Sequence, residues 1–173
     1  MKATLKVINQ MQTDDVIEQY AIGGAVGATF YLEPVATLDI DVFVSFRKAT
    51  GRSLISLSPI YDYLTARGCK TKKEYIVIEG WPVQFLPPGN ALGEEALAQA
   101  IETTLDGIPT RVMTAEHLVA IALQTGRAKD FARILQFIEA GLLDSDKLNA
   151  ILKRHRLLAK WEDFGHRFLR GKK

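Results

Sequence analysis

Cysteine is nearly absent from this 173-residue chain, with Cys69 as its one example. A single cysteine cannot form an internal disulfide, and no histidine is spaced from it as the ligands of a zinc site would be. The chain also lacks an apolar run of about eighteen residues, the length at which a membrane-spanning helix is considered. Residues 1–15 contain no apolar segment followed by a small-residue cleavage site. Together these absences predict a cytoplasmic protein with no membrane association.

The composition is that of an ordinary globular domain, with 47% apolar and 24% charged residues. A chain of this length can bury a full hydrophobic core. The net charge of +2 conceals an asymmetry. Residues 147–173 hold nine Lys or Arg against two acids, whereas residues 1–146 hold thirteen against eighteen. We therefore expect one compact unit that ends in a basic segment.

The most informative stretch is an apolar run that contains two acids, Asp39-Ile40-Asp41. In a strand over Asp39–Phe46, alternate side chains share a face, so the two carboxylates would converge on one point. Converging carboxylates are costly unless they are protonated, paired with a cationic side chain or bound to a metal ion. Magnesium accepts one or two protein carboxylates and completes its coordination with water and phosphate oxygens. Asp39 and Asp41 are therefore predicted to hold Mg²⁺, as one ion or as a two-ion site.

A glycine pair, Gly23-Gly24, precedes the acids, between a predicted strand (Tyr20–Ile22) and a predicted helix (Ala25–Leu32). Glycine lets a backbone approach a ligand closely, and the N-terminus of a helix offers N–H groups to an anion. A triphosphate could then lie between the helix and the metal. The alternative is a tight strand-to-helix turn with no ligand.

These parts occur in the order apolar residue, Gly-Gly, helical interval and Asp-x-Asp on a strand, and they resemble the signature of the nucleotidyltransferase superfamily that includes DNA polymerase beta. Downstream, residues 114–123 and the segment Gly126-Arg127-Ala128-Lys129-Asp130 resemble the bacterial abortive-infection nucleotidyltransferase toxins and their uncharacterised relatives. The resemblance implies a nucleoside triphosphate substrate, and it raises a toxin–antitoxin role with an antitoxin as partner. It also implies that Lys129 contacts a phosphate or base and contributes to catalysis, with Asp130 in a supporting role. The alternative is that Lys129 and Asp130 form an exposed helix start.

The chain departs from the superfamily pattern at the strand Trp81–Leu86, where Gln84 stands at the position expected for a third carboxylate. An amide oxygen can ligate a cation weakly or contact the nucleotide, but it cannot accept a proton at neutral pH. Glu74 and Glu79 are candidate substitutes. Glu79-Gly80, however, reads as the turn of a hairpin between Lys72–Ile78 and Trp81–Leu86.

The remaining pattern predicts an α+β fold, in which a mixed sheet is flanked by helices and followed by a helical C-terminal part. We divide the chain into a nucleotidyltransferase-like core at 1–113 and a helical region at 114–173 packed on it. The other expected elements are a first helix closing over Asp14–Gln19, helices at Leu54–Ala66 and Leu92–Leu105, a strand at Pro109–Met113, and a helix capped by Thr114. From there the chain is expected to be helical, with a break near Lys160.

The basic side chains of this last segment could contact an RNA or DNA backbone, although a solvated helix face is the alternative. They are Lys153, Arg154, Arg156, Arg167 and Arg170. His155 falls on the apolar stripe and is interpreted as a packing residue. Two functions therefore remain open from sequence. One is a Mg²⁺-dependent transferase that moves a nucleoside monophosphate to a hydroxyl of RNA, protein or a small molecule, and the other is a nucleotide-binding or partner-binding module that has lost turnover.

Overall fold

The computed structural model describes residues 1–33, 37, 39–47 and 56–169, and its centre is a mixed sheet of strand order β3-β4-β5-β2-β1-β7-β6. Its strands are β1 (Gln19–Ile22), β2 (Ile40–Ser45), β3 (Lys70–Lys72), β4 (Tyr75–Ile78), β5 (Trp81–Leu86), β6 (Ile101–Leu105) and β7 (Ile108–Val112). The helices are α1 (Lys2–Thr13), α2 (Gly24–Ala28), α3 (Ser58–Thr65), α4 (Ala91–Ala98), α5 (Ala115–Thr125), α6 (Ala128–Glu139), α7 (Ser145–Arg154) and α8 (Leu158–Phe168). The predicted α+β class, with a helical C-terminal region, is confirmed.

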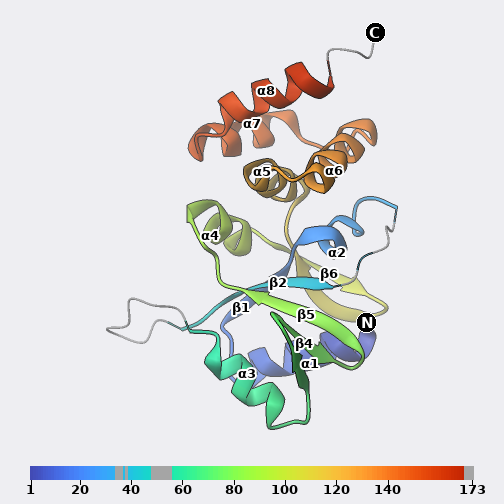
Figure 1. Ribbon diagram of the computed structural model, residues 1–173, viewed down its shortest axis with the longest axis vertical. Coiled ribbons are helices and arrows are strands. Elements are labelled where there is room, and N and C mark those ends of the chain that lie inside the picture. Colours follow the sequence, from blue (N-terminus) through green and yellow to red (C-terminus); the bar gives the residue numbers. More distant parts are fainter. Residues whose placement is uncertain (34–36, 38, 48–55, 170–173) are drawn as a thin grey trace.

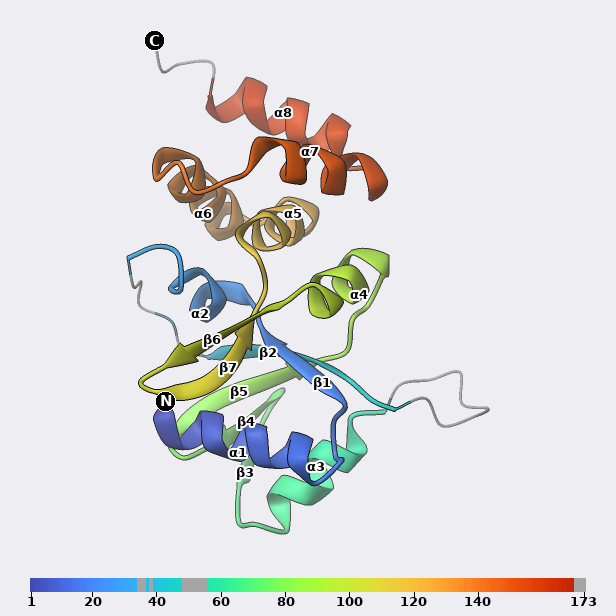
Figure 2. The same cartoon turned by 180° about the vertical axis from the view of Figure 1, so that it is seen from behind.

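Helices cover both faces of the sheet. Helices α1 and α3 lie on one face, whereas α2 and α4 lie on the other, beneath the layer formed by α5 to α8 (Figures 1 and 2). The alternating direction of side chains along β2 explains why both faces of the sheet are covered. Ile40, Val42 and Val44 are fully buried in the same hydrophobic cluster as residues of α1 and α3. Asp41 and Phe43 consequently point to the opposite face, toward α2 and the C-terminal helices.

Two of the hairpins in the sheet have two-residue turns with positive φ at both positions. Glu79 and Gly80 (φ 51° and 82°) join β4 to β5, so the predicted turn is confirmed and Glu79 lies at its tip. Asp106 and Gly107 (φ 51° and 75°) join β6 to β7 in the same way. The predicted helix over Leu92–Leu105 is therefore wrong beyond Ala98. The β-branched residues of β6 and the Asp-Gly turn favour a hairpin there.

Several predicted helix ends also differ from the structure. The first helix ends at Thr13, since the chain turns at Asp15 with φ 57°. Helix α2 is only five residues long and stops at Ala28, short of Leu32. Helix α3 begins at Ser58, whereas Leu54 lies outside the described residues.

The C-terminal helices pack on the sheet through one shared hydrophobic cluster. Thr114 caps α5 as predicted, because its hydroxyl oxygen accepts a hydrogen bond from the His117 N–H. The cluster joins residues of α5 to α8 to Ala28 of α2 and Leu92 of α4. The break between the last two helices falls at residues 155–157, before Lys160. The division into domains at 113/114 stays a prediction. Over the described ranges, no helix combines the length and the apolarity needed to cross a membrane.

One carboxylate ties α4 to α5 and α7. Arg154 donates two hydrogen bonds to Glu95, from Nε to Oε2 (2.8 Å) and from Nη2 to Oε1 (2.7 Å). His155 Nε2 lies 2.7 Å from Glu95 Oε2, and His117 Nε2 lies 3.3 Å from Oε1. His155 therefore has a polar partner as well as the packing role predicted for it. Arg154 lowers the pKa of Glu95 to about 2, together with hydrogen bonds from the two histidines.

This cluster predicts that acid destabilises the fold. The pKa of Glu95 is below its unfolded value of 4.5, so its contribution is present above pH 4.5 and is lost as the pH falls toward 2. Burial lowers the pKa of His117 below 6.5, so acidification below that pH also favours the unfolded state. We expect Glu95→Gln to reduce stability at neutral pH by about 2 kcal/mol and to flatten the loss below pH 4.5. Thermal melts across this range test it, with the exposed Glu94→Gln as control, and equal pH profiles for the two variants would contradict it.

Candidate functional site

A cavity of about 330 Å³ lies between the sheet and the first two C-terminal helices. We call it the carboxylate cavity. Its size is at the lower end of the range for small-molecule sites. The polar and glycine residues that line it are Gly24, Thr37, Asp39, Asp41, Tyr75, Gln84, Thr125, Arg127, Lys129, Asp130 and Arg133. Six of the seven predicted site residues are thus brought together, and Gly23 lies just behind this lining.

Asp39 and Asp41 line the cavity from the start of β2. The Thr37 hydroxyl donates to the backbone oxygen of Asp39 (3.2 Å) and to its Oδ1 (3.4 Å). Burial raises the pKa of Asp41, and the like charge of Asp39 adds to this effect. Three cations, Arg127, Lys129 and Arg133, act in the opposite direction. The carboxylate pair therefore faces positive charge from α6 across the cavity.

The glycine pair sets the position of Asp41. The Gly23 N–H donates to the backbone oxygen of Asp41 at 2.9 Å, which fixes the turn against β2. Gly24 has φ +57°, and a Cβ at this position would overlap the carboxylate of Asp41. Only glycine leaves space for that carboxylate. Because α2 has only five residues, the predicted contribution of a helix dipole to anion binding is not supported, and close backbone approach remains.

Gln84 lies directly beside Asp41, because β5 runs parallel to β2 with these two residues in register. Both side chains line the carboxylate cavity. Glu74 and Glu79 do not line it, since Glu74 precedes β4 and Glu79 lies at the hairpin tip. The position expected for a third carboxylate is therefore occupied by an amide.

Asp130 is almost fully buried, with a relative exposure of 1%. Its carboxylate accepts two hydrogen bonds from the Arg127 guanidinium, at 2.7 and 3.2 Å, and a third from the Arg127 backbone N–H at 3.2 Å. Arg133 approaches the same carboxylate at 3.8 Å. Asp130 therefore starts α6 through a capping interaction and orients two cations, which agrees with a supporting role.

Sequence reasoning did not select Arg127, Arg133 or Tyr75 as site residues. Arg133 lies four residues after Lys129, a spacing that places both side chains on one face of a helix, so this signal was available. The position of Tyr75 in the cavity depends on the pairing of strands that are not adjacent in sequence. The pairs Ile76↔Val83 and Asp41↔Gln84 place Tyr75, Gln84 and Asp41 in a row across β4, β5 and β2.

The donor set can be compared with the needs of Mg²⁺. Asp41 offers carboxylate oxygens from β2 and Asp39 from the residue just before that strand, and the Gln84 amide oxygen is adjacent to Asp41. Among the residues that the structure describes, no cluster of three or more His, Cys, Asp or Glu side chains could hold a metal ion. This set fits a hard cation that keeps water and phosphate oxygens as its other ligands, and it does not fit a metal held by protein alone.

We expect Asp130→Asn to lower stability by about 1–2 kcal/mol, because it weakens the helix cap and removes the partner of two cations. Arg127 is 58% exposed in its side chain and can regain water, which limits the cost. Nucleotide affinity should also fall, about tenfold, because Arg127 loses its fixed position. Denaturant unfolding and calorimetry measure both effects. Asp163→Asn, which breaks an exposed pair with Arg167, is the control, and a similar loss in that variant would contradict the assignment.

Comparisons with known proteins support the fold alone. No family model matches the chain, and no curated protein matches its sequence. Among solved structures, the chain is similar to the antibiotic-resistance factor ANT(2'')-Ia, with a TM-score of 0.54 and 14% identity over 96% of this chain and 97% of that one. It is also similar to an antigenic nucleotidyltransferase-like protein from Paracoccidioides brasiliensis, with a TM-score of 0.54 and 15% identity over 91% and 90% of the two chains. The fold of this chain is nucleotidyltransferase-like.

Proposed function

We propose that this chain is a Mg²⁺-dependent nucleotidyltransferase that moves a nucleoside monophosphate from a nucleoside triphosphate to a hydroxyl acceptor. One observation carries the proposal. Within a nucleotidyltransferase-like fold, a single cavity has the carboxylates of Asp39 and Asp41 on its sheet side and the cations of α6 on its helical side. Such a cavity can bind a metal–triphosphate complex, since each component meets groups of opposite charge.

Each residue then has a defined task. Asp39 and Asp41 hold the cation, which when bound neutralises phosphate charge. Gly24 keeps the backbone close enough for phosphates to approach Asp41. Lys129, with Arg127 and Arg133, supplies fixed positive charge for the departing pyrophosphate. Gln84 offers its amide to the nucleotide or the cation and cannot serve as the general base.

The test is incubation of the pure protein with α-labelled nucleoside triphosphates, Mg²⁺ and a cell extract. The proposal expects label on a macromolecule or small molecule, together with release of pyrophosphate. Lys129→Ala should reduce transfer by about 100-fold, because a charged contact to the triphosphate is lost. Lys147→Ala, at an exposed residue outside the carboxylate cavity, is the matched control. Nucleotide consumption that is equal in both variants would overturn the proposal.

The second candidate is a nucleotide-binding module with the same fold and no turnover. The amide of Gln84 beside Asp41 favours it, because a general base is worth about 10²–10⁴-fold in rate. Gln84→Asp separates the two candidates. In a module that has lost turnover, the variant should bind Mg²⁺ more tightly and gain transfer activity by about tenfold or more. In a working enzyme adapted to glutamine, turnover should stay constant or fall, and this result in calorimetry and transfer assays would exclude the second candidate.

A nucleic-acid acceptor would need exposed basic side chains on the C-terminal helices. Of the basic residues predicted to contact RNA, Arg154 is paired with Glu95, and Arg167 lies 3.5 Å from Asp163 and over two aromatic rings. Lys153 and Arg156 are exposed, and Arg170 lies outside the described residues. A nucleic-acid acceptor therefore rests on fewer basic residues than the sequence suggested. A role as the toxin of a toxin–antitoxin pair stays a prediction from the resemblance.

A further inference from the structure

Strand β3 is an exposed and basic edge of the sheet. It is the last strand on the side of β4 and β5, and all three of its residues are exposed. Residues 67–74 hold four cations against one acid, and these cations are Arg67, Lys70, Lys72 and Lys73. Arg67 lies 3.6 Å from Asp14, whereas the three lysines form no ion pair with any residue that the structure describes. Their positive charge is therefore available to a partner.

The two lysines of β3 point to the same face of the sheet as Asp41, because residues paired in neighbouring strands share a face. Lys72 pairs with Tyr75 of β4. Tyr75 lies in the row across β4, β5 and β2 that ends at Asp41, so Lys72 extends this row to the edge of the sheet. Lys70, two residues before Lys72, lies on the same face. With neighbouring strands about 4.8 Å apart, the backbones of Lys72 and Asp41 are separated by about 14 Å.

Tyr75 forms the boundary between this basic edge and the carboxylate cavity. Its hydroxyl hydrogen-bonds to the carboxylates of Asp39 and Glu74, and its side chain is partly exposed. The ring is therefore held where it both lines the cavity and lies beside Lys72. An aromatic ring next to cations is the combination by which proteins bind single-stranded nucleic acid, since bases stack on the ring and phosphates contact the cations.

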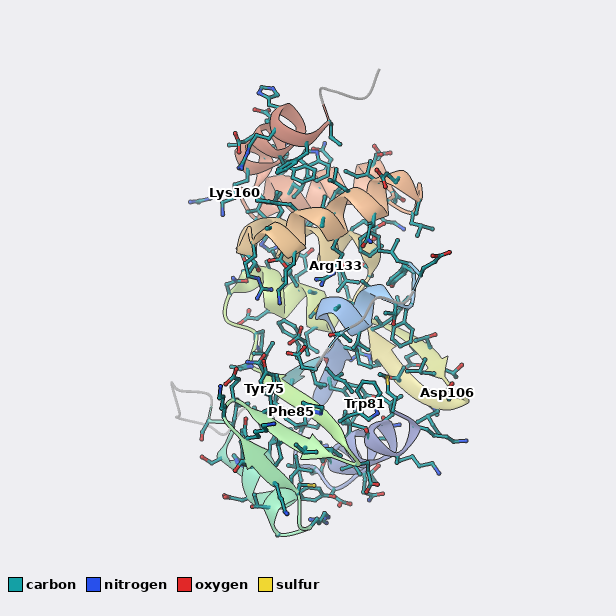
Figure 3. The ribbon with its side chains drawn as sticks, turned by 45° about the vertical axis from the view of Figure 1, so that its right-hand side comes forward. Tyr75, Trp81, Phe85, Asp106, Arg133 and Lys160 are labelled. Carbon is teal, nitrogen blue, oxygen red and sulfur yellow. The ribbon has the colours of Figure 1, made fainter. Side chains whose placement is uncertain are left out.

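The basic C-terminal helices are placed less well for this task. Figure 3 shows Tyr75 on the sheet, Arg133 in the helical layer above it and Lys160 of α8 farther away. Helices α5 and α6 thus separate α7 and α8 from the sheet (Figures 1 and 2). A nucleic acid bound at α7 would have to pass these helices to reach the carboxylates, whereas one bound at β3 reaches them along one face of the sheet.

We propose that Lys70, Lys72 and Tyr75 form an acceptor surface, and that the acceptor is the terminal hydroxyl of a single-stranded nucleic acid. The inference rests on the proposed function and names its substrate class. At about 3.4 Å per stacked nucleotide, about four nucleotides span the distance from Lys72 to Asp41. The lysines contact phosphates behind the end of the nucleic acid, a base near the end stacks on Tyr75, and the terminal hydroxyl enters the carboxylate cavity.

Transfer to this acceptor lengthens it by one nucleotide. The oxygen of the terminal hydroxyl forms a bond to the α-phosphorus of the triphosphate, and the bond from that phosphorus to the oxygen bridging to the β-phosphate breaks. Pyrophosphate leaves with the electron pair of that bond. The hydroxyl proton passes to solvent, because the Gln84 amide cannot accept it. The product is a phosphodiester at the end of the nucleic acid.

The experiment uses a single-stranded oligonucleotide of about twelve nucleotides, as RNA and as DNA, with the full chain, Mg²⁺ and each common nucleoside triphosphate. We expect extension by one nucleotide and an oligonucleotide affinity, measured by fluorescence anisotropy, that falls with added salt. The double variant Lys70→Gln, Lys72→Gln removes two phosphate contacts and should reduce the slope of log affinity against log salt by about 1.4. At about 0.1 M salt this change lowers the affinity about 20-fold. Triphosphate affinity in calorimetry should stay the same, since neither lysine lines the carboxylate cavity.

Matched variants test the position of the surface and the role of the ring. The double variant Lys153→Gln, Arg156→Gln also removes two exposed cations, at the end of α7, and should keep the salt slope of the parent. Tyr75→Leu should lower oligonucleotide affinity about tenfold through lost stacking. Tyr75→Phe keeps the ring and should retain most of the affinity.

The outcomes separate the two proposals. Extension of RNA alone or of DNA alone supports the acceptor surface and identifies the sugar. Transfer of label to another class of acceptor in a cell extract, with neither oligonucleotide extended, would overturn it and leave the proposed function standing. Equal salt slopes in the β3 variant and the parent would also overturn it, and the lysines would then only keep an exposed edge from pairing with other chains. Failure of the parent to bind any triphosphate would remove the proposed function, and the acceptor surface with it.

Discussion

Asp41→Asn should abolish Mg²⁺-dependent nucleotide binding and, at neutral pH, raise the thermal stability of the protein. Loss of a group that only orients a metal ligand reduces metal affinity by about 10–100-fold. Loss of the ligand itself should reduce the affinity at least as much. We expect a loss of at least about 100-fold for this reason. The fold should be retained, because asparagine has the shape of aspartate and the Gly23–Asp41 hydrogen bond uses only backbone atoms.

The gain in stability follows from the sign of the pKa shift. Burial and Asp39 raise the pKa of Asp41 above its unfolded value of 3.8. The folded state therefore prefers the protonated carboxyl, and this contribution is fully present below pH 3.8 and lost as the pH rises through the folded-state pKa. At neutral pH the ionised carboxylate opposes folding, and the neutral amide removes this cost. The proposed metal ligand Asp41 is thus held at the expense of stability.

Calorimetry with and without Mg²⁺ and thermal melts measure the two effects together. Asp62→Asn, at an exposed site on α3, is the control and should change neither quantity. Triphosphate affinity equal to that of the parent, or a melting temperature below that of Asp62→Asn, would count against this account of Asp41.

Gly24→Ala should impair the site through geometry, with no change in charge. Its backbone has φ +57°, a conformation that costs an alanine about 1–2 kcal/mol. The added Cβ would also overlap the Asp41 carboxylate, which must move. We expect stability to fall by about 2 kcal/mol or more and nucleotide affinity to fall by at least about tenfold, since misplaced groups weaken binding and catalysis steeply.

Gly68→Ala provides a matched control for this variant. Gly68 also has positive φ (+84°), but no atom lies within 4 Å of the position that its Cβ would take. This control should show the backbone cost, about 1 kcal/mol, with unchanged nucleotide affinity. If both variants bind triphosphate equally well, Gly24 has no role in placing Asp41.

The parts of the site that depend on local geometry could be predicted from sequence. The period of a strand placed Asp39 and Asp41 on one face, and the glycine pair located the turn beside them. Arg127 and Tyr75 were missed because their positions depend on how α6 packs over the sheet and on the β4–β5 register. The hairpin at Asp106-Gly107 was missed for a different reason. Its Asp-Gly turn signal was present, but residues 92–105 before it were predicted as one helix.

The most direct test of the central claim is a crystal structure of the full chain with Mg²⁺ and a non-hydrolysable nucleoside triphosphate. The account predicts a cation bound to both Asp39 and Asp41, with the terminal phosphates at Lys129 and Arg133. A triphosphate bound outside the carboxylate cavity, or a cation that contacts neither carboxylate, would contradict it.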